Sequence, residues 1–247
     1  MYQKTETAIM FTGGQDSTAA ACELLKQGHK VHLLSFNNGI CIRLSKPLDR
    51  ANELSRVFGN ENIKHESIDS QETMQFLRTN SKKIIKEYKS PLVFDLICRF
   101  AMEINTIIYC KKNNVNRVAD GNNVAQGQIF IQQKQYLDIV DAFYKEYNIE
   151  SIHPVYFRSQ TRNTNLKILS ENGLDEGNKF FEKLNISSQL LNQPFCFWAP
   201  ISFLFTSPLR KLGFEKLLGL STENAIELRK KLQDIARNYI ENKNHDK

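Results

Sequence analysis

The chain has 247 residues, 41% of them hydrophobic, which is enough for one large domain or for one domain with a small addition. Its net charge of +6 permits an anionic partner, nucleic acid included, without requiring one. An odd number of widely spaced cysteines without a CxxC pair argues against a disulfide framework and against a structural zinc site; they are Cys22, Cys41, Cys98, Cys110 and Cys196.

Strands and helices are predicted to alternate along the first part of the chain. The run 7–11 predicts a buried strand, and no signal peptide is expected before it. The next segments predict a helix over 16–28, a strand over 30–36, a helix over 47–59 and a strand over 63–69. In the second of these helices, one face is expected to hold Leu48, Ala51, Leu54, Ser55 and Phe58.

The later segments continue this alternation and then become helical. Residues 71–90 are polar and basic, and they predict a helix followed by a mobile loop. The remaining predictions are helices over 92–114 and 134–147, strands over 117–121 and 151–157, and a terminal helix over 221–244 capped by Ser221 or Thr222.

This order predicts an α/β fold, with a doubly wound, Rossmann-like parallel sheet covered by helices on both faces. We expect a core domain over 1–160 and a helical C-terminal extension over 161–247. No apolar run approaches about 18 residues, so we expect a cytoplasmic protein without a membrane span.

The stretch FTGGQDSTAAACELL, residues 11–25, places small, hydroxyl and acidic side chains at one joint between strand and helix. Gly13 and Gly14 permit a close approach of an anion to the main chain, and the helix N-terminus supplies N–H groups and a positive dipole end. Asp16 would act either as a helix cap or as a ligand of a magnesium ion that bridges phosphates. The spacing fits neither the dinucleotide nor the Walker pattern, and a βα turn without a ligand is the alternative interpretation.

The segment TGGQDST resembles the SGGxDS loop of the PP-loop, or N-type, ATP pyrophosphatases, and it occurs where that family has it. The resemblance implies an enzyme that cleaves ATP between the α and β phosphates and transfers AMP to an oxygen of its substrate. A nitrogen or sulfur nucleophile then displaces the AMP. It also implies ATP and Mg²⁺ as cofactors, Asp16 as a metal-organising catalytic residue, and ATP contacts from Thr12, Gly13, Gly14, Gln15, Asp16, Ser17 and Thr18.

Two further segments resemble the 7-cyano-7-deazaguanine synthases of that superfamily. Residues 32–59 are similar to its second-strand region, with Asn37 where the family usually carries Asp, and this implies that Ser35 and Phe36 meet the adenine. VADGNN, residues 118–123, resembles its fourth-strand turn and implies that Gly121 and Asn122 lie near the nucleotide. The family's phosphate-binding Lys would fall near Gln160, with Arg158, Arg162 or Lys167 as substitutes.

The acceptor stays open between two branches of the superfamily. The deazaguanine synthases carry zinc-binding cysteines near the C-terminus, where this chain has only Cys196. Some tRNA thiolases use two cysteines, and Cys98 and Cys196 fall in comparable places, which implies a persulfide carrier and a cysteine that releases the sulfur. The alternative is that both cysteines are simply buried.

We therefore expect adenylation of a nucleobase or tRNA base followed by sulfur or nitrogen insertion. Thiolation of tRNA leads, with amide or nitrile formation on a deazapurine as the alternative. The expected partners are ATP, a tRNA or modified purine and a sulfur donor protein, and a homodimer is compatible with the sequence. A nucleotide-sensing module without chemistry, and amidation of a small carboxylate with ammonia, remain rival interpretations.

Three further groups of residues leave the function open. His153 is a candidate acid or base, although a lone His is more often structural. Cys41 could face the substrate, whereas Cys22 and Cys110 are expected in the core. Two basic clusters could follow an RNA backbone or form solvated helix faces; they are Lys82, Lys83, Lys86 and Lys89, and Arg229, Lys230 and Lys231.

Overall fold

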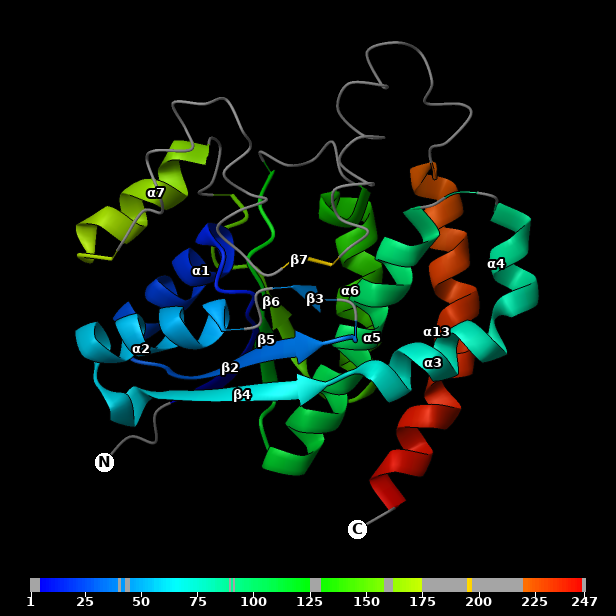
Figure 1. Cartoon of the computed structure of the whole chain (residues 1–247), viewed down its shortest axis with the longest axis horizontal. Coiled ribbons are helices and arrows are strands. Elements are labelled where there is room, and N and C mark those ends of the chain that lie inside the picture. The colour runs from blue at the N-terminus through cyan, green and yellow to red at the C-terminus, as the bar shows by residue number, and fades with distance from the viewer. Residues whose placement is uncertain are drawn as a thin grey trace.

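A five-stranded parallel sheet forms the centre of the molecule (Figure 1). The computed structural model describes residues 5–39, 41–42, 45–88, 90, 92–124, 130–157, 162–174, 195–196 and 220–245. The sheet has the order β4-β2-β1-β5-β6. Its strands are β1 (Glu6–Met10), β2 (Lys30–Asn37), β4 (Ile63–Asp69), β5 (Arg117–Ala119) and β6 (Glu150–Ile152). The chain adds β2 and β4 on one side of β1 and then β5 and β6 on the other, so the winding direction changes between β1 and β5.

Helices cover both faces of this sheet, as the alternating sequence pattern predicts. One face is covered by α1 (Gln15–Lys26), α2 (Lys46–Phe58) and α7 (Arg162–Glu171), which share one hydrophobic cluster. The other face carries α3 (Gln71–Asn80), α4 (Lys82–Tyr88), α5 (Leu92–Asn113), α6 (Lys134–Glu146) and α13 (Thr222–His245). The short elements are η1 (Asn60–Asn62), η3 (Phe130–Gln132) and a two-stranded antiparallel sheet of β3 (Cys41–Ile42) and β7 (Phe195–Cys196).

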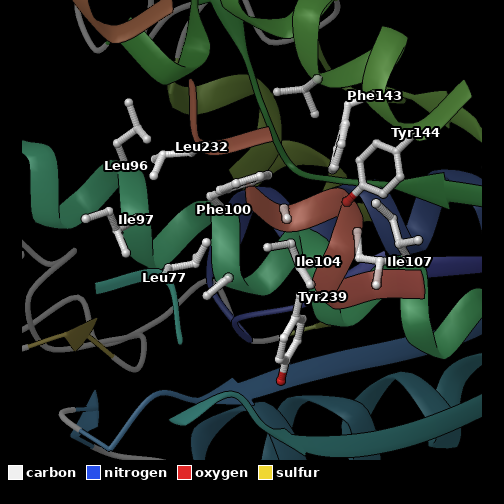
Figure 2. Packing of buried hydrophobic residues seen from close by; sticks show 14 of the residues in the cluster. Leu77, Leu96, Ile97, Phe100, Ile104, Ile107, Phe143, Tyr144, Leu232 and Tyr239 are labelled. Carbon is white, nitrogen blue, oxygen red and sulfur yellow. The ribbon is translucent and has the colours of Figure 1, made fainter. Parts of the chain in front are cut away.

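The larger hydrophobic cluster forms where α5, α6 and α13 meet (Figure 2). Phe100 of α5 and Phe143 of α6 lie with their ring centroids 5.6 Å apart, and Leu232 of α13 is fully buried in the same cluster. Each such side chain contributes about 1.5–3 kcal/mol by leaving water. The helix α13 is therefore part of the core on this face of the sheet.

The residues of the predicted C-terminal extension pack on both faces of the sheet. Leu169 of α7 is buried with α1, and Leu228 of α13 is buried with α5. The predicted cap of α13 is confirmed, because the main-chain N–H of Asn224 donates to Ser221 Oγ at 3.1 Å. The domain boundary between residues 160 and 161 stays a prediction. In the described part of the chain, no helix combines the length and the apolar composition that a membrane span requires.

Three local predictions are wrong. Residues 82–88 form the helix α4 and not a mobile loop, because Ile84 and Ile85 pack against the larger cluster. The strand predicted over 151–157 is β6, which ends at Ile152, and a turn follows at Pro154, which cannot donate to the sheet. Leu48 is 48% exposed, because the buried side of α2 is set by Pro47, Ala51 and Leu54.

Candidate nucleotide site

The predicted glycine loop connects β1 to α1 at the carboxyl edge of the sheet. Gly13 has φ +70°, a conformation that favours glycine, and a Cβ there would lie 2.9 Å from the Cα of Pro47 at the start of α2. The N-cap of α1 is Gly14, which has an extended backbone and receives no side-chain cap bond. The first helical N–H groups have no partner inside the helix and lie in the turn that follows these glycines.

Three hydroxyl side chains hold the loop together from within. Thr18 Oγ donates to the carbonyl oxygen of Gly14 at 2.7 Å. Ser17 Oγ accepts from the main-chain N–H of Thr12 at 3.3 Å and also lies 3.3 Å from the Thr12 hydroxyl. Thr12 Oγ accepts in turn from the main-chain N–H of Gly14 at 3.3 Å. These bonds fix the curvature of the loop around Gly13.

Asp16 lies in the first turn of α1 and contacts α7. Its Oδ1 accepts a hydrogen bond of 2.6 Å from the side-chain amide of Asn165, which is 2% exposed. Because the N-cap is Gly14, Asp16 is not the capping residue that one interpretation of the sequence predicts. Gln15 is the first residue of the same helix.

Gly121 brings the turn after β5 directly against the start of α1. A Cβ on Gly121 would lie 2.5 Å from the main-chain nitrogen of Ser17 and 2.6 Å from the carbonyl carbon of Asp16. The predicted residues of the glycine loop and of the turn at Gly121 and Asn122 are thus brought together at the switch point of the sheet. Open α/β sheets bind their ligands at that point.

Asp120 organises this turn, although the sequence did not identify it as a site residue. Its carboxylate accepts hydrogen bonds from the Asn122 main-chain N–H at 3.0 Å and from the Asn122 side-chain amide at 2.6 Å. It also accepts from Arg99 Nη2 at 2.8 Å and contacts His153 Nδ1 at 2.9 Å. The sequence could have indicated Asp120, because it is an acid directly after a strand and next to Gly121, which was predicted to lie near the nucleotide. The contacts from Arg99 and Asn165 join segments far apart in the chain, so no local sequence pattern could reveal them.

The charges around Asp120 fix its protonation and that of His153. Burial alone would raise the pKa of Asp120, but the charge and hydrogen bond of His153, together with Arg99, lower it. Burial alone would lower the pKa of His153, but its bonds to Asp120 and Asp141 raise that pKa to about 10. His153 is therefore a cation at neutral pH, which favours the structural interpretation over a general base.

The end of β2 presents main-chain groups beside the loop. Its pairing with β1 ends at Met10 and Leu34, and the main-chain N–H of Phe11 donates to the carbonyl oxygen of Leu34. Because alternate residues of a strand face the same neighbour, Phe36 directs its N–H and C=O toward the space that β1 has left. The Ser35 hydroxyl instead pairs with His65 Nε2 at 2.9 Å on the β4 side.

Two local contacts involve the cysteines of the predicted pair. Cys98 Sγ, on α5, accepts a hydrogen bond of 2.8 Å from the side-chain amide of Asn38, which directly follows β2. Cys41 follows three residues after Asn38 and is paired with Cys196 in the β3–β7 register. Cys22 and Cys110 are buried as predicted, and burial raises the pKa of each thiol to about 12.

The predicted cationic groups lie in different environments. Lys167 is exposed on α7 with Glu171 3.8 Å away, whereas Arg158, Gln160 and the side chain of Arg162 lie outside the described residues. Lys82, Lys83 and Lys86 are exposed on α4, and Lys89 lies outside the described residues. The prediction for Arg229 is wrong: this residue is fully buried and forms no part of a solvated basic face.

The residues present fit an adenine nucleotide. Gly13 and Gly121 leave space beside the helix N-terminus that a Cβ would close, and first-turn N–H groups are suited to phosphate oxygens. Within the described residues, no group of three or more His, Cys, Asp or Glu side chains could hold a metal ion alone. The carboxylate of Asp16 is of the kind that binds Mg²⁺ at nucleotide sites together with phosphate oxygens and water.

Comparison with solved structures finds similar chains at low sequence identity, and the first of those described here has the same fold. A 4-thiouridine synthetase in complex with RNA and bound ATP has a TM-score of 0.53 at 16% identity, over 94% of this chain and 53% of that one. The U34-tRNA thiolase NcsA from Methanococcus maripaludis has a TM-score of 0.49 at 16% identity, covering 93% and 72%. NMN synthetase from Francisella tularensis has a TM-score of 0.47 at 16% identity, over 71% of this chain and 64% of that one.

Comparison of sequences identifies the family. No curated protein matches this chain. Residues 6–165 match the family described as queuosine biosynthesis protein QueC, and this range contains the glycine loop, the end of β2 and the turn at Asp120. The chain therefore belongs to the QueC family of the PP-loop ATP pyrophosphatases, which are ATP-dependent enzymes.

Proposed function

We propose that this enzyme transfers AMP from ATP to a carbonyl oxygen of a nucleobase, either free or in tRNA, and that a second nucleophile then displaces the AMP. The observation that carries the proposal is the close approach of Gly121 to the first turn of α1, which brings two loops of the switch point to one helix N-terminus. Helix N-termini are suited to bind phosphate groups. In the first step the carbonyl oxygen attacks the α-phosphorus and pyrophosphate leaves. In the second the nucleophile bonds to the base carbon and AMP leaves with the former carbonyl oxygen.

The residues of the loop would divide the work of binding ATP. First-turn N–H groups of α1, with Gly13, Gly14 and Ser17 around them, would bind the phosphates, and Asp16 would hold the magnesium ion. The main-chain N–H and C=O of Phe36 match the acceptor N1 and the donor N6 of adenine. Catalysis would then rest on positioning and on the neutralisation of phosphate charge.

The placement of the cysteines supports sulfur as the incoming atom. A sulfur donor protein would charge Cys98 as a persulfide, whose terminal sulfur would attack the activated base carbon. Attack of a second thiolate, that of Cys196, on the Cys98 sulfur would release the thiolated base and leave a disulfide, which a dithiol reduces. Cys98 is partly exposed beside Asn38, and Cys196 is the register partner of Cys41, which follows Asn38 by three residues.

The test is product analysis with the purified full chain, ATP and Mg²⁺, with and without bulk tRNA. We expect AMP and pyrophosphate in the presence of RNA, and their loss in Asp16→Ala. Asp49→Ala is the matched control, because Asp49 is also an acid in a first helical turn, that of α2. ADP and phosphate as products, or equal activity in Asp16→Ala and Asp49→Ala, would contradict the proposal.

Cysteine variants test the sulfur step separately. Cys98→Ser and Cys196→Ser should still form AMP and pyrophosphate but should release no thiolated base. Cys110→Ala is the control, because Cys110 is fully buried and its thiol pKa of about 12 keeps it protonated. Thiolated product from Cys98→Ser would contradict this step.

The family match supports a second candidate for the same site. A deazapurine carboxylate could be activated as its adenylate and converted by ammonia to an amide, and then to a nitrile by a second activation. The observation that favours it is the match of residues 6–165 to the queuosine biosynthesis family. This candidate predicts AMP formation with a deazapurine carboxylate and ammonium, independent of RNA and unchanged by Cys98→Ser.

A further inference from the structure

A chain of buried, alternating charges runs from the C-terminal helix to the nucleotide site. Arg229 of α13 and Glu103 of α5 are both fully buried, and Arg229 Nη2 lies 2.5 Å from Glu103 Oε2. The other oxygen of Glu103 accepts from Arg99 Nε at 3.0 Å, and Arg99 Nη2 donates to Asp120 at 2.8 Å. His153 and Asp141 continue the alternation on the far side of Asp120.

Arg99 is therefore shared between two carboxylates. One of them, Asp120, shapes the turn that holds Gly121 against α1, and the other, Glu103, takes no direct part in that turn. A buried carboxylate needs a full complement of partners. If Arg229 were replaced by an uncharged residue, Arg99 would move toward Glu103 and away from Asp120.

The surroundings of Arg229 hold it in place for this role. Its guanidinium lies 3.8 Å from the ring centroid of Phe100 and 5.3 Å from that of Phe143, two rings that Figure 2 shows in the core. The buried Tyr136 also interacts with Arg229, whose charge opposes the rise that burial causes in the pKa of Tyr136, and Glu103 supplies the counter-charge of Arg229. Arg229 also lies outside residues 6–165, the part of the chain that matches the family.

We propose that Arg229 is a positioning residue for the nucleotide site: by satisfying Glu103, it leaves Arg99 to hold Asp120 and thereby the turn at Gly121 against the glycine loop. The inference rests on the proposed ATP site. It assigns to α13, beyond packing, control over the geometry of a site to which it contributes no ligand.

The test compares the ATP dissociation constant and the unfolding free energy in a double-mutant cycle of the full chain. Arg229→Met should weaken ATP binding by at least about tenfold, which corresponds to about 1.4 kcal/mol. Adding Glu103→Gln removes the unsatisfied charge but keeps an acceptor for Arg99, so the double variant should bind ATP within about threefold of the parent. A role in packing alone predicts no such recovery.

Two further variants keep the proposal falsifiable. Arg237→Met is the matched control, because Arg237 lies on the same helix in a partly exposed ion pair with Glu146 and should leave ATP binding unchanged. Arg229→Lys retains the charge but holds Glu103 less well, because an ammonium lacks the forked geometry of a guanidinium. This variant should fold even if Arg229→Met does not, and it should bind ATP about threefold more weakly than the parent. Reduced stability with unchanged ATP binding in Arg229→Lys and Arg229→Met would overturn the proposal.

The same measurements separate this inference from the proposed function. If the parent protein binds no ATP, or if Gly121→Ala leaves its affinity unchanged, the nucleotide site itself is wrongly assigned. If the parent binds ATP and Gly121→Ala does not, while Arg229→Met behaves like Arg237→Met, only the role of Arg229 is refuted.

Discussion

Gly121 is the residue on which the geometry of the site depends most directly. Its missing side chain lets the turn after β5 approach the backbone at Asp16 and Ser17, where an added Cβ would lie only 2.5 Å from the main-chain nitrogen of Ser17. Gly121→Ala must displace that turn or the start of α1, because neither contact is with a flexible side chain. We expect a loss of about 1–3 kcal/mol in stability from overpacking. We also expect ATP binding at least about tenfold weaker by calorimetry.

Gly28→Ala is the control for this substitution. Gly28 lies just beyond the other end of α1, with φ +84° and no atom within 4 Å of an added Cβ. The change should cost about 1–2 kcal/mol because alanine is strained at positive φ, and it should leave ATP affinity unchanged. Equal effects of the two variants on ATP binding would show that the close approach at Gly121 does not shape the site.

His153 gives the protein a pH dependence with a defined direction. Its folded pKa of about 10 lies above the ordinary value of 6.5, because Asp120 and Asp141 stabilise the cation despite burial. The stability that His153 supplies is therefore complete below about pH 6.5 and is lost as the pH rises toward 10. Urea unfolding should show His153→Gln far less stable than the parent at pH 7, with the difference shrinking toward pH 10. The control His29→Gln should leave the dependence of the unfolding free energy on pH unchanged between pH 7 and pH 10. If the difference in unfolding free energy between His153→Gln and the parent did not depend on pH, this assignment would be contradicted.

Residues that act through local pattern were predictable, and residues that act across the fold were not. The glycine loop combines its signals within seven residues, so Gly13, Gly14 and Ser17 were identified correctly as one unit at a strand–helix joint. Arg229 was grouped with its neighbours Lys230 and Lys231, although it follows Ala225 and Leu228 on the buried stripe of α13. Helical periodicity, applied to this cation, was the signal that could have corrected the prediction.

At the scale of elements, a hydrogen bond between Asn165 and Asp16 joins α7 to the glycine loop. Asn165 donates to Asp16 at 2.6 Å and is 2% exposed. Asn165→Ala removes a bond to a charged acceptor, so we expect a loss of about 1.5–3 kcal/mol. Hydrogen exchange of α7 and of the first turn of α1 should accelerate together. Asn172→Ala, at the end of the same helix, removes only a local bond to the carbonyl oxygen of Ile168 and should leave α1 unchanged.

The long elements were predictable because their patterns are strong, and the short ones were not. The strands β1, β2 and β4 are continuous apolar or alternating runs, and the structure has them within a residue of the predicted bounds. The strands β3 and β7 have two residues each and pair across more than 150 residues of chain, so no local pattern could reveal them. Their pairing places Cys41 opposite Cys196 in the register, and the catalytic role of Cys98 and Cys196 stays a prediction.

At the scale of the whole molecule, the excess of positive charge is not evenly available to a partner. Arg229 is buried against Glu103, and Lys231 lies 2.9 Å from Glu227 and 3.5 Å from Glu87. In contrast, Lys82, Lys83 and Lys86 are exposed on α4, which precedes the helix that carries Cys98. If the acceptor is a base within tRNA, this helix is the part of the surface best suited to follow its backbone.

Salt dependence distinguishes a tRNA acceptor from a free base. The logarithm of the tRNA binding constant should fall linearly with the logarithm of the salt concentration. Replacing Lys82, Lys83 and Lys86 by Glu should reduce the steepness of this line by about 2–3, because each neutralised phosphate contributes about 0.7–0.9 to it. The matched control replaces Lys26, Lys30 and Lys112, which are also exposed but lie at the amino edge of the sheet, where α1 and α5 end and β2 begins. Both triple variants change the net charge equally, so a general electrostatic attraction would affect them alike. A smaller slope confined to the α4 variant, measured by filter binding, would place the RNA at the edge that carries the glycine loop. Equal slopes in all three proteins, with AMP formation from a free deazapurine unaffected by salt, would instead favour the small-molecule acceptor.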